Sequence, residues 1–299
     1  LGFGGRAPGY VAATEEWNTG VAVGAWVTGG ALNVPRSEHA GSGTQTAALS
    51  FGGRNPVEGQ TETYNGTAWT SVNNMNNARA QLMGSGTQTS TLASGGEPAL
   101  TVTETWNGTN WTEVSDLNTG KYASGAAGVS NTSSLVFGGR TPPYTTTTES
   151  WDGSSWTEVN DMNTARGYLG GTGTKTAALA FAGRIAPGAA ISPAVTELWN
   201  GTNWTEVNDM NTVRRTLAGA GVTTSALAFG GTNGSKTGAT EAWNGSSWTT
   251  VGTMNIARNL FGGGAGANNT SALAFGGPPA TTATEEWTDP GIITKTLTT

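Results

Sequence analysis

The sequence predicts an all-β fold, a seven-bladed β-propeller of four-stranded antiparallel blades, from a long internal repeat, a recurring hairpin turn and a glycine-rich composition. The string TESWDGSSWTEVNDMNTAR, residues 148–166, returns in closely similar form elsewhere in the 299-residue chain. Its first aromatic residue recurs about every 42 to 48 residues, at Trp17, Tyr64, Trp106, Trp151, Trp199, Trp243 and Trp287. A fixed period in this range is the signature of a repeat architecture such as a propeller.

Each repeat unit is expected to form four short strands, named a to d in chain order. In one unit they are Ala80–Gly86 (a), Ser90–Gly96 (b), Thr101–Trp106 (c) and Asn110–Val114 (d). Asn107-Gly108 separates the last two, and Asn-Gly between alternating strands is a strong hairpin signal because both turn positions take positive φ. The 47 glycines suit such tight turns, and the abundant threonines suit strands.

The predicted number of blades comes from counting the ends of strand b and the aromatics of strand c. A double glycine ends strand b at residues 4–5, 52–53, 95–96, 138–139, 230–231 and 276–277, with Ala182-Gly183 as the variant. Strands a and d have one copy fewer, so the first blade is expected to begin at its second strand. We expect one domain over residues 1–299, with residues 288–299 as a closing strand or tail. Ile292–Leu297 is expected to be either the outer strand of the last blade or the missing inner strand of the first.

The repeat pattern resembles the kelch repeat. A double glycine follows an apolar strand, an aromatic comes about 10 to 16 residues later, a Trp about five residues beyond it, and a basic residue opens the next unit. The resemblance covers practically the whole chain, although kelch units often have Tyr-Asp where this chain mostly has Trp-Asn. It implies a kelch-like propeller. The near-identical, Asn-, Thr- and Gly-rich units are also similar in style to propellers of phage and marine viral structural proteins.

Composition excludes several classes of function. The net charge is -6 and the basic residues are scattered, so a nucleic-acid partner is not expected. The sequence has no apolar run long enough for membrane insertion. With one histidine and no cysteine, zinc or copper chemistry is not expected, and we predict no cofactor and no enzymatic activity. The Asp152-Gly153 turn lacks the spacing of the Asp box of sialidase-type propellers, and the Asn-Gly-Thr/Ser sequons are interpreted as hairpin turns.

Two rings of charged residues repeat once in each unit. The acids lie two residues before each strand-c aromatic, at Glu15, Glu62, Glu104, Glu149, Glu197, Glu241 and Glu285. The bases open strand a, at Arg36, Arg79, Lys121, Arg166, Arg214 and Arg258. Because the same groups recur at the same point of every unit, we interpret both rings as structural, joined by charge-assisted hydrogen bonds that bridge blades.

The variable b–c loops are the expected binding region, since function concentrates where loops vary on a rigid scaffold. Arginine and tyrosine are typical of binding hot spots, and the candidates are Arg6, Tyr10, Arg54, Arg140, Tyr144 and Arg184. We therefore expect a non-enzymatic binding or structural protein that is virion-associated (phage tail, fibre or capsid) or extracellular, possibly in a larger assembly. It would dock a protein or a glycan through its b–c and d–a loops. The alternative is a lectin-like propeller with repeated sugar pockets built from Trp and Asn.

Overall fold

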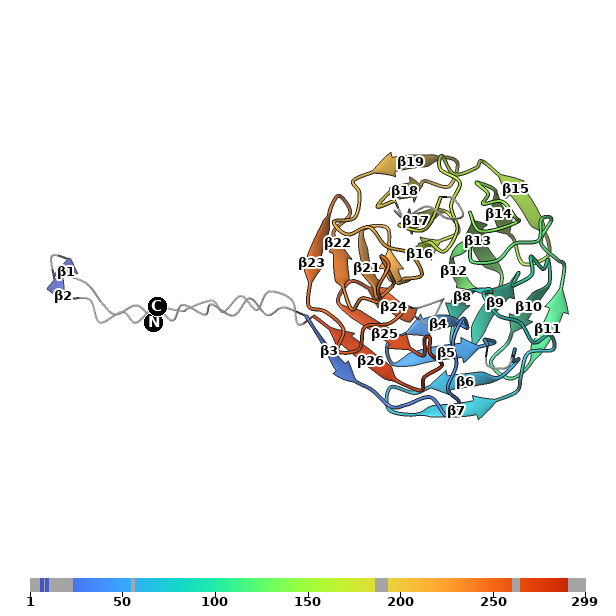
Figure 1. Cartoon of the computed structure of the whole chain (residues 1–299), viewed down its shortest axis with the longest axis horizontal. Coiled ribbons are helices and arrows are strands. Elements are labelled where there is room, and N and C mark those ends of the chain that lie inside the picture. The colour runs from blue at the N-terminus through green and yellow to red at the C-terminus, as the bar shows by residue number, and fades with distance from the viewer. Residues whose placement is uncertain are drawn as a thin grey trace.

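The described part of the chain forms a closed ring of six four-stranded antiparallel blades (Figure 1). The structure is a computed structural model that describes residues 24–54, 57–185, 193–259 and 264–289, together with the backbone of β1 (Arg6–Ala7) and β2 (Gly9–Tyr10). Those two strands pair with each other in a separate two-stranded sheet. The innermost strands of the six blades contact one another in order and return to the first, which closes the ring.

The blades are numbered I to VI in ring order, with each strand a innermost. Blades I to III contain β4 (Ala40–Thr44), β5 (Ala47–Phe51), β6 (Thr61–Tyr64) and β7 (Trp69–Val72); β8 (Met83–Thr87), β9 (Ser90–Ser94), β10 (Thr103–Trp106) and β11 (Trp111–Val114); and β12 (Gly125–Ser130), β13 (Ser133–Phe137), β14 (Thr148–Trp151) and β15 (Trp156–Val159). Blades IV to VI contain β16 (Gly170–Thr174), β17 (Ala177–Phe181), β18 (Thr196–Trp199) and β19 (Trp204–Val207); β20 (Ala218–Val222), β21 (Ser225–Phe229), β22 (Thr240–Trp243) and β23 (Trp248–Val251); and β24 (Gly264–Asn268), β25 (Ser271–Phe275), β26 (Thr284–Thr288) and β3 (Ala25–Thr28).

The predicted count of seven blades is wrong, because strands from near the start and near the end of the chain belong to the same blade. Strand β3, near the start of the chain, pairs with β26 and places Trp26 opposite Trp287. The second Trp that the last repeat lacks in sequence is therefore supplied by Trp26. The six basic residues and six second tryptophans gave the true count, whereas Gly4-Gly5 and Trp17 lie outside the described residues. The strand expected at Ile292–Leu297 also lies outside them, and β3 occupies the outer edge of β26.

The c–d hairpins form where the Asn-Gly pairs predict them, but each loop has four residues, as in 107–110 between Trp106 and Trp111, and of Asn107 and Gly108 only the glycine takes a positive φ. In blade II, Asn107 Oδ1 accepts hydrogen bonds from the backbone amides of Thr109 and Asn110, both at 2.9 Å. Gly108 takes a φ of 94°, which a residue with a Cβ adopts at a cost. This turn sets the register that places Trp106 opposite Trp111.

Glycine in the innermost strands lets neighbouring blades approach closely. A Cβ added at Gly84 of β8 would lie 2.8 Å from the carbonyl oxygen of Gly41 in β4, and one added at Gly171 of β16 would lie 2.9 Å from the amide nitrogen of Ala126 in β12. Both distances are shorter than real side-chain contacts allow. Small residues in strand a are therefore a steric requirement of this ring.

Adjacent blades are joined by an aromatic contact and a hydrogen bond that repeat around the ring. Phe51 at the end of strand b in blade I packs on Trp111 of strand d in blade II, with ring centroids 5.0 Å apart. The indole Nε1 of Trp111 donates to Thr61 Oγ1 of blade I at 3.0 Å. The same aromatic contact joins Phe137 to Trp204, Phe181 to Trp248, Phe229 to Trp26 and Phe275 to Trp69.

Blade II departs from this pattern by a compensating pair of residues. Ser94 occupies the position of the phenylalanine, and Met83 is its cross-strand neighbour. In blade III the corresponding pair is Phe137 and Gly125, and a Cβ on Gly125 would lie 2.3 Å from the Phe137 ring. Met83 is buried in the same apolar cluster as Trp156 of blade III. The methionine therefore fills from strand a the volume that phenylalanine fills from strand b elsewhere.

We predict strong coupling between Met83 and Ser94. Met83→Gly should destabilise the protein by about 2 to 5 kcal/mol by leaving a cavity, and Ser94→Phe should destabilise it because its ring overlaps Met83. The double variant rebuilds the arrangement of blade III and should recover much of both losses, with a coupling free energy of about 1 to 3 kcal/mol. Denaturant unfolding of the four proteins measures it; strictly additive losses would contradict the compensation.

Closure by β3 predicts that Trp26 contributes as much to stability as a tryptophan inside the repeats. Trp26→Ala should lower the free energy of unfolding by about 3 to 5 kcal/mol, because Trp26 packs on Phe229 and its indole donates to Thr240 Oγ1 at 3.0 Å. Trp111→Ala is the matched control, since Trp111 makes the equivalent contacts within the repeats. A loss near zero for Trp26→Ala, beside a large loss for Trp111→Ala, would show that β3 does not close the ring.

Candidate binding face

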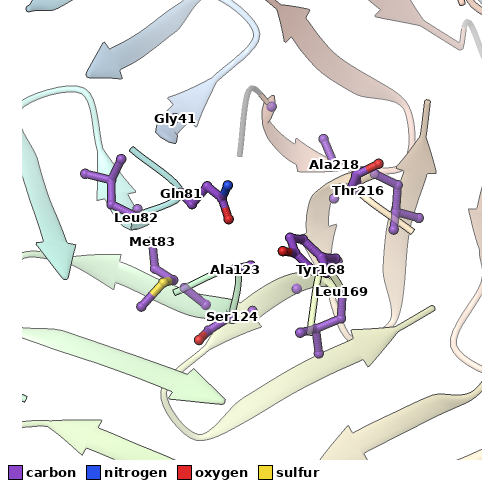
Figure 2. Close-up of a pocket in the computed structure, with 18 residues that line it drawn as sticks. Gly41, Gln81, Leu82, Met83, Ala123, Ser124, Tyr168, Leu169, Thr216 and Ala218 are labelled. Atoms are coloured by element: carbon purple, nitrogen blue, oxygen red, sulfur yellow. The ribbon is translucent and has the colours of Figure 1, made fainter. Parts of the chain in front are cut away.

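The b–c and d–a connections emerge on one face of the ring, here called the loop face, and the a–b and c–d hairpins emerge on the other. This follows from the up-and-down order of the strands in each blade. Residues of the loop face surround the opening of the central channel, where strand a begins (Figure 2). The chemistry of this face differs from blade to blade, whereas the packing between blades repeats.

The acidic and basic rings are buried beneath the loop face and form six ion pairs among the described residues. In blade IV, Glu197 Oε1 accepts from Arg166 Nη2 at 3.0 Å, and Glu197 Oε2 accepts from the backbone amide and Nδ2 of Asn163 at 2.7 and 3.0 Å. Asn163 Nδ2 also donates to the carbonyl of Trp204. The other pairs are Arg36–Glu62, Arg79–Glu104, Lys121–Glu149, Arg214–Glu241 and Arg258–Glu285, while Glu15 lies outside the described residues.

Each basic residue joins two blades, although not through the side-chain bridge expected from the sequence. Its side chain pairs with the glutamate of the blade that it opens, so each ion pair lies within one blade. Its backbone carbonyl accepts a hydrogen bond from the second glycine of the preceding blade, as in Gly139 N to Arg166 O at 2.8 Å. Burial lowers the pKa of Arg166 to about 10, and the Glu197 carboxylate opposes that shift. These buried groups cannot reach a partner.

A ring of strained residues surrounds the channel opening. Two positions after the basic residue, the backbone of blades I to V takes a positive φ without glycine, between 51° and 57°, at Glu38, Gln81, Ala123, Tyr168 and Thr216. Their backbones form a chain of hydrogen bonds from blade to blade, from Gln81 N to Glu38 O through to Thr216 N to Tyr168 O. Such a conformation costs about 1 kcal/mol or more per residue and is concentrated at functional sites.

The channel opening is too small to enclose a ligand. The cavity at the opening has a volume of about 90 Å³, whereas pockets that bury small molecules have about 300 to 1,000 Å³. Figure 2 shows Gln81, Ala123, Tyr168 and Thr216, each from a different blade, around this opening. Strand a of the six blades lines a further space of about 300 Å³ along the channel. A partner larger than a small molecule would lie across the loops.

The structure separates the predicted binding residues into different environments. Arg6 and Tyr10 pair through their backbones in the β1–β2 sheet, and their side chains lie outside the described part. Arg54 is neutralised, because Nε lies 2.7 Å from Glu38 Oε2 and Nη2 forms an ion pair with Glu97. Arg54 and the two glutamates thus link blades I and II on the loop face.

Arg140 and Tyr144 lie together in a cluster that the sequence did not fully reveal. The guanidinium carbon of Arg140 is 5.3 Å from the ring centroid of Tyr122 and 5.6 Å from that of Tyr144. Nη1 of Arg140 donates to the hydroxyl of Tyr168 at 3.4 Å, and the Tyr144 and Tyr168 rings pack edge to face at 6.2 Å. Tyr122 and Tyr168 were not predicted as binding residues. They lie one and two residues after members of the basic ring, and that ring was interpreted as structural.

Arg184 and Arg215 extend the positive charge of this cluster. Burial raises the pKa of the Tyr144 hydroxyl, and the positive charges of Arg184, Arg140 and Arg215 oppose that rise. The positive charges of three guanidinium groups therefore influence the Tyr144 hydroxyl electrostatically. Arg215 directly follows the basic ring residue Arg214, as Tyr122 follows Lys121. This position in the repeat is the sequence feature from which its location near Tyr144 could have been predicted.

His39 is a buried histidine in the wall between blades I and VI. It occupies the position held by Leu82, Leu169 and Leu217 in other blades and packs on the Phe275 ring at 5.5 Å. Neither ring nitrogen has a hydrogen-bond partner of good geometry among the described residues, although the Phe275 backbone lies close enough to act on the imidazole. Burial, together with the nearby Arg36 cation, lowers the pKa of His39 to about 3. The folded protein therefore holds this imidazole neutral.

His39 should make stability depend on pH below neutrality. Its pKa is about 3 in the folded protein and about 6.5 in the unfolded chain, so the unfolded state gains a proton first as the pH falls. Full stability is present above about pH 6.5 and is lost progressively toward pH 3. His39→Leu should remove this term, so that the stability difference between the two proteins changes by about 2 kcal/mol between pH 7 and pH 5. Denaturant titrations at both pH values measure this, and parallel pH profiles would contradict it.

The comparisons with known proteins support the fold alone. The chain matches the solved structure of YjhT with a TM-score of 0.68 over 86% of this chain and 95% of that one, at 14% sequence identity. No protein-family model matches the sequence, and the search of curated proteins finds no relative. The chain is thus similar in fold to YjhT, and its function has to be argued from its own residues.

Three further observations bear on the kind of site. Among the described residues, no cluster of His, Cys, Asp and Glu is suited to hold a metal ion, and no helix is long and apolar enough to cross a membrane. The tryptophans of strands c and d within the ring are all buried. Their rings therefore offer no exposed surface for the repeated sugar pockets of the lectin alternative.

Proposed function

We propose that this chain is a non-enzymatic binding module that docks a protein or a glycan across its loop face. The observation that carries this proposal is the contrast between a uniform buried framework and a loop face on which each blade presents different side chains. Blades I and II present the Arg54 network, whereas blades III to V present Arg140, Arg184 and Arg215 with three tyrosines. A scaffold that serves only as a spacer has no need of such differences.

The repeats are proposed to be of kelch type, since the double glycine, the paired strand-c and strand-d aromatics and the basic residue that opens each unit all have structural roles in the ring. The proposed setting is a virion or another extracellular surface. The low fraction of charged residues (11%) and the Asn-, Thr- and Gly-rich repeats support it. In that setting the ring would be one component of a larger assembly.

Site-specific photo-crosslinking tests the docking face with two closely matched positions. Val213 lies on the loop face with 40% of its surface exposed, and Val222 lies on the hairpin face with 37% exposed. With a benzoylphenylalanine at one or the other position, in the particle or cell that carries the protein, we expect a discrete crosslinked product from position 213 and none from position 222. A virion or envelope component as that product would support the setting.

Crosslinks from position 222 alone would show that the hairpin face is the docking surface. No crosslink from either position would count against a binding module. Both variants must retain the wild-type melting temperature. This is expected because both valine side chains are exposed and neither is part of the buried core.

A further inference from the structure

The Arg140 guanidinium is held in a fixed orientation on the loop face by aromatic contacts. Its guanidinium lies over the rings of Tyr122 and Tyr144, at 5.3 and 5.6 Å from their centroids. Cation–π contacts of this kind hold the planar group without using its hydrogen bonds. Among the described residues, the guanidinium makes one hydrogen bond, from Nη1 to the Tyr168 hydroxyl at 3.4 Å. The remaining N–H groups of the guanidinium are left to a ligand.

The backbone fixes this arrangement independently of the Arg140 side chain. Tyr122 and Arg140 exchange backbone hydrogen bonds, Tyr122 N to Arg140 O at 3.1 Å and Arg140 N to Tyr122 O at 2.8 Å. Arg140 also forms a β-bridge with Tyr144. Tyr122 and Tyr144 are 6% and 9% exposed, whereas Arg140 is only partly buried. The arginine is therefore presented to solvent on a rigid aromatic base.

The charge of the Arg140 guanidinium itself has no carboxylate partner among the described residues. Arg54, the corresponding arginine of blade I, is paired with Glu38 and Glu97. Among the described residues, no carboxylate lies within ion-pair distance of Arg140, and the charges of Arg184 and Arg215 add to its own at the Tyr144 hydroxyl. A guanidinium without an ion-pair partner among the described residues favours an anionic ligand at this point, although the net charge of the chain is -6.

The surroundings favour a protein segment over a sugar. The opening beside the cluster is too small to enclose a ring, at about 90 Å³, and the Tyr122 and Tyr144 faces are covered. Ile185 follows Arg184, and Val213 precedes the buried Arg214 by one position; they are exposed by 46% and 40%. Arginine and tyrosine are the side chains enriched at protein–protein hot spots, and Ile185 and Val213 add exposed apolar side chains elsewhere on the same face.

We propose that Arg140, supported by Arg184 and Arg215, binds a carboxylate of an acidic segment in a protein partner. This proposal rests on the proposed function, in which the loop face is the docking surface. The carboxylate accepts hydrogen bonds from the outward N–H groups of Arg140. Apolar side chains of the segment lie against Ile185 and Val213. The strained ring at the channel opening forms the floor beneath the segment.

Selection from a random-sequence peptide library tests this proposal. Against the wild-type propeller we expect enrichment of peptides rich in Asp and Glu. Arg140→Gln should weaken the selected peptides by about tenfold or more, since a directly hydrogen-bonded charge is lost. Arg140→Lys should recover only part of the affinity, because lysine keeps the charge and lacks the planar fork. Fluorescence anisotropy with labelled peptides measures these affinities.

Lys236→Gln is the matched control, because it removes one positive charge from the same face. The Lys236 side chain is exposed and donates to the carbonyl of Pro278 at 2.7 Å. Its loss should change affinity by about twofold or less if recognition is local to Arg140. An equal loss in both variants would mean general charge attraction and would overturn the proposed site. Arg140→Gln should lower the melting temperature little, because the backbone hydrogen bonds with Tyr122 and the bridge to Tyr144 remain when the side-chain contacts are lost.

The remaining outcomes separate this proposal from the proposed function. Selected peptides without acidic enrichment, or acidic peptides that bind Arg140→Gln equally well, would overturn the carboxylate site, while crosslinking from position 213 would still support the loop face. Binding of polygalacturonate, lost in Arg140→Gln, without selection of any peptide would overturn the protein partner in favour of an acidic glycan. No enrichment of any peptide and no polysaccharide binding would also reject the carboxylate site.

Discussion

The buried ion pair at the foot of each blade is the interaction on which the rest of this ring depends. A carboxylate and a guanidinium removed from water lose several kcal/mol of hydration each, and only complete hydrogen bonding restores the balance. The Glu197 carboxylate achieves this with Arg166 and two hydrogen bonds from Asn163, which also donates to the carbonyl of Trp204, whereas Arg166 Nε has no partner among the described residues. The carboxylate therefore fixes the d–a connection against strands c and d of the blade that follows.

The same arrangement explains why the repeat is so regular. Loss of one member would leave the other buried and unpaired, so each unit keeps the glutamate, the asparagine and the basic residue together. The backbone carbonyl of that basic residue then ties the unit to the double glycine of the blade before it. The exposed variation lies at positions one and two residues after the basic residue and in the b–c loops, whereas the buried exceptions, His39 and the Met83–Ser94 pair, fill the interior. The exposed positions form the loop face, and diversity there does not disturb the interior.

Sequence alone established the propeller, the four-stranded blade and the hairpin turns, because each rests on local chemistry that repeats. The blade number was missed because the counts of strand-b ends and strand-c aromatics were followed instead of the six basic residues and six second tryptophans, and because Trp26 pairs with Trp287 across almost the whole chain. Arg140 and Tyr144 were found in one loop, but Tyr122 and Tyr168 come from two different d–a connections. Only the ring geometry brings them together. The left-handed backbone of Glu38 and Gln81 has no sequence signal, since neither is glycine.

The glycine-rich innermost strands also bear on how such a protein changes in evolution. Near-identical units are prone to unequal recombination, which adds or removes whole repeats. Strands as slender as β8 and β16 bring neighbouring blades into direct backbone contact at the axis, and a ring with one more unit would move those backbones apart and leave an unfilled hole. Bulkier residues in strand a would have to appear at the same time. The glycines of strand a therefore limit how many repeats the ring can contain.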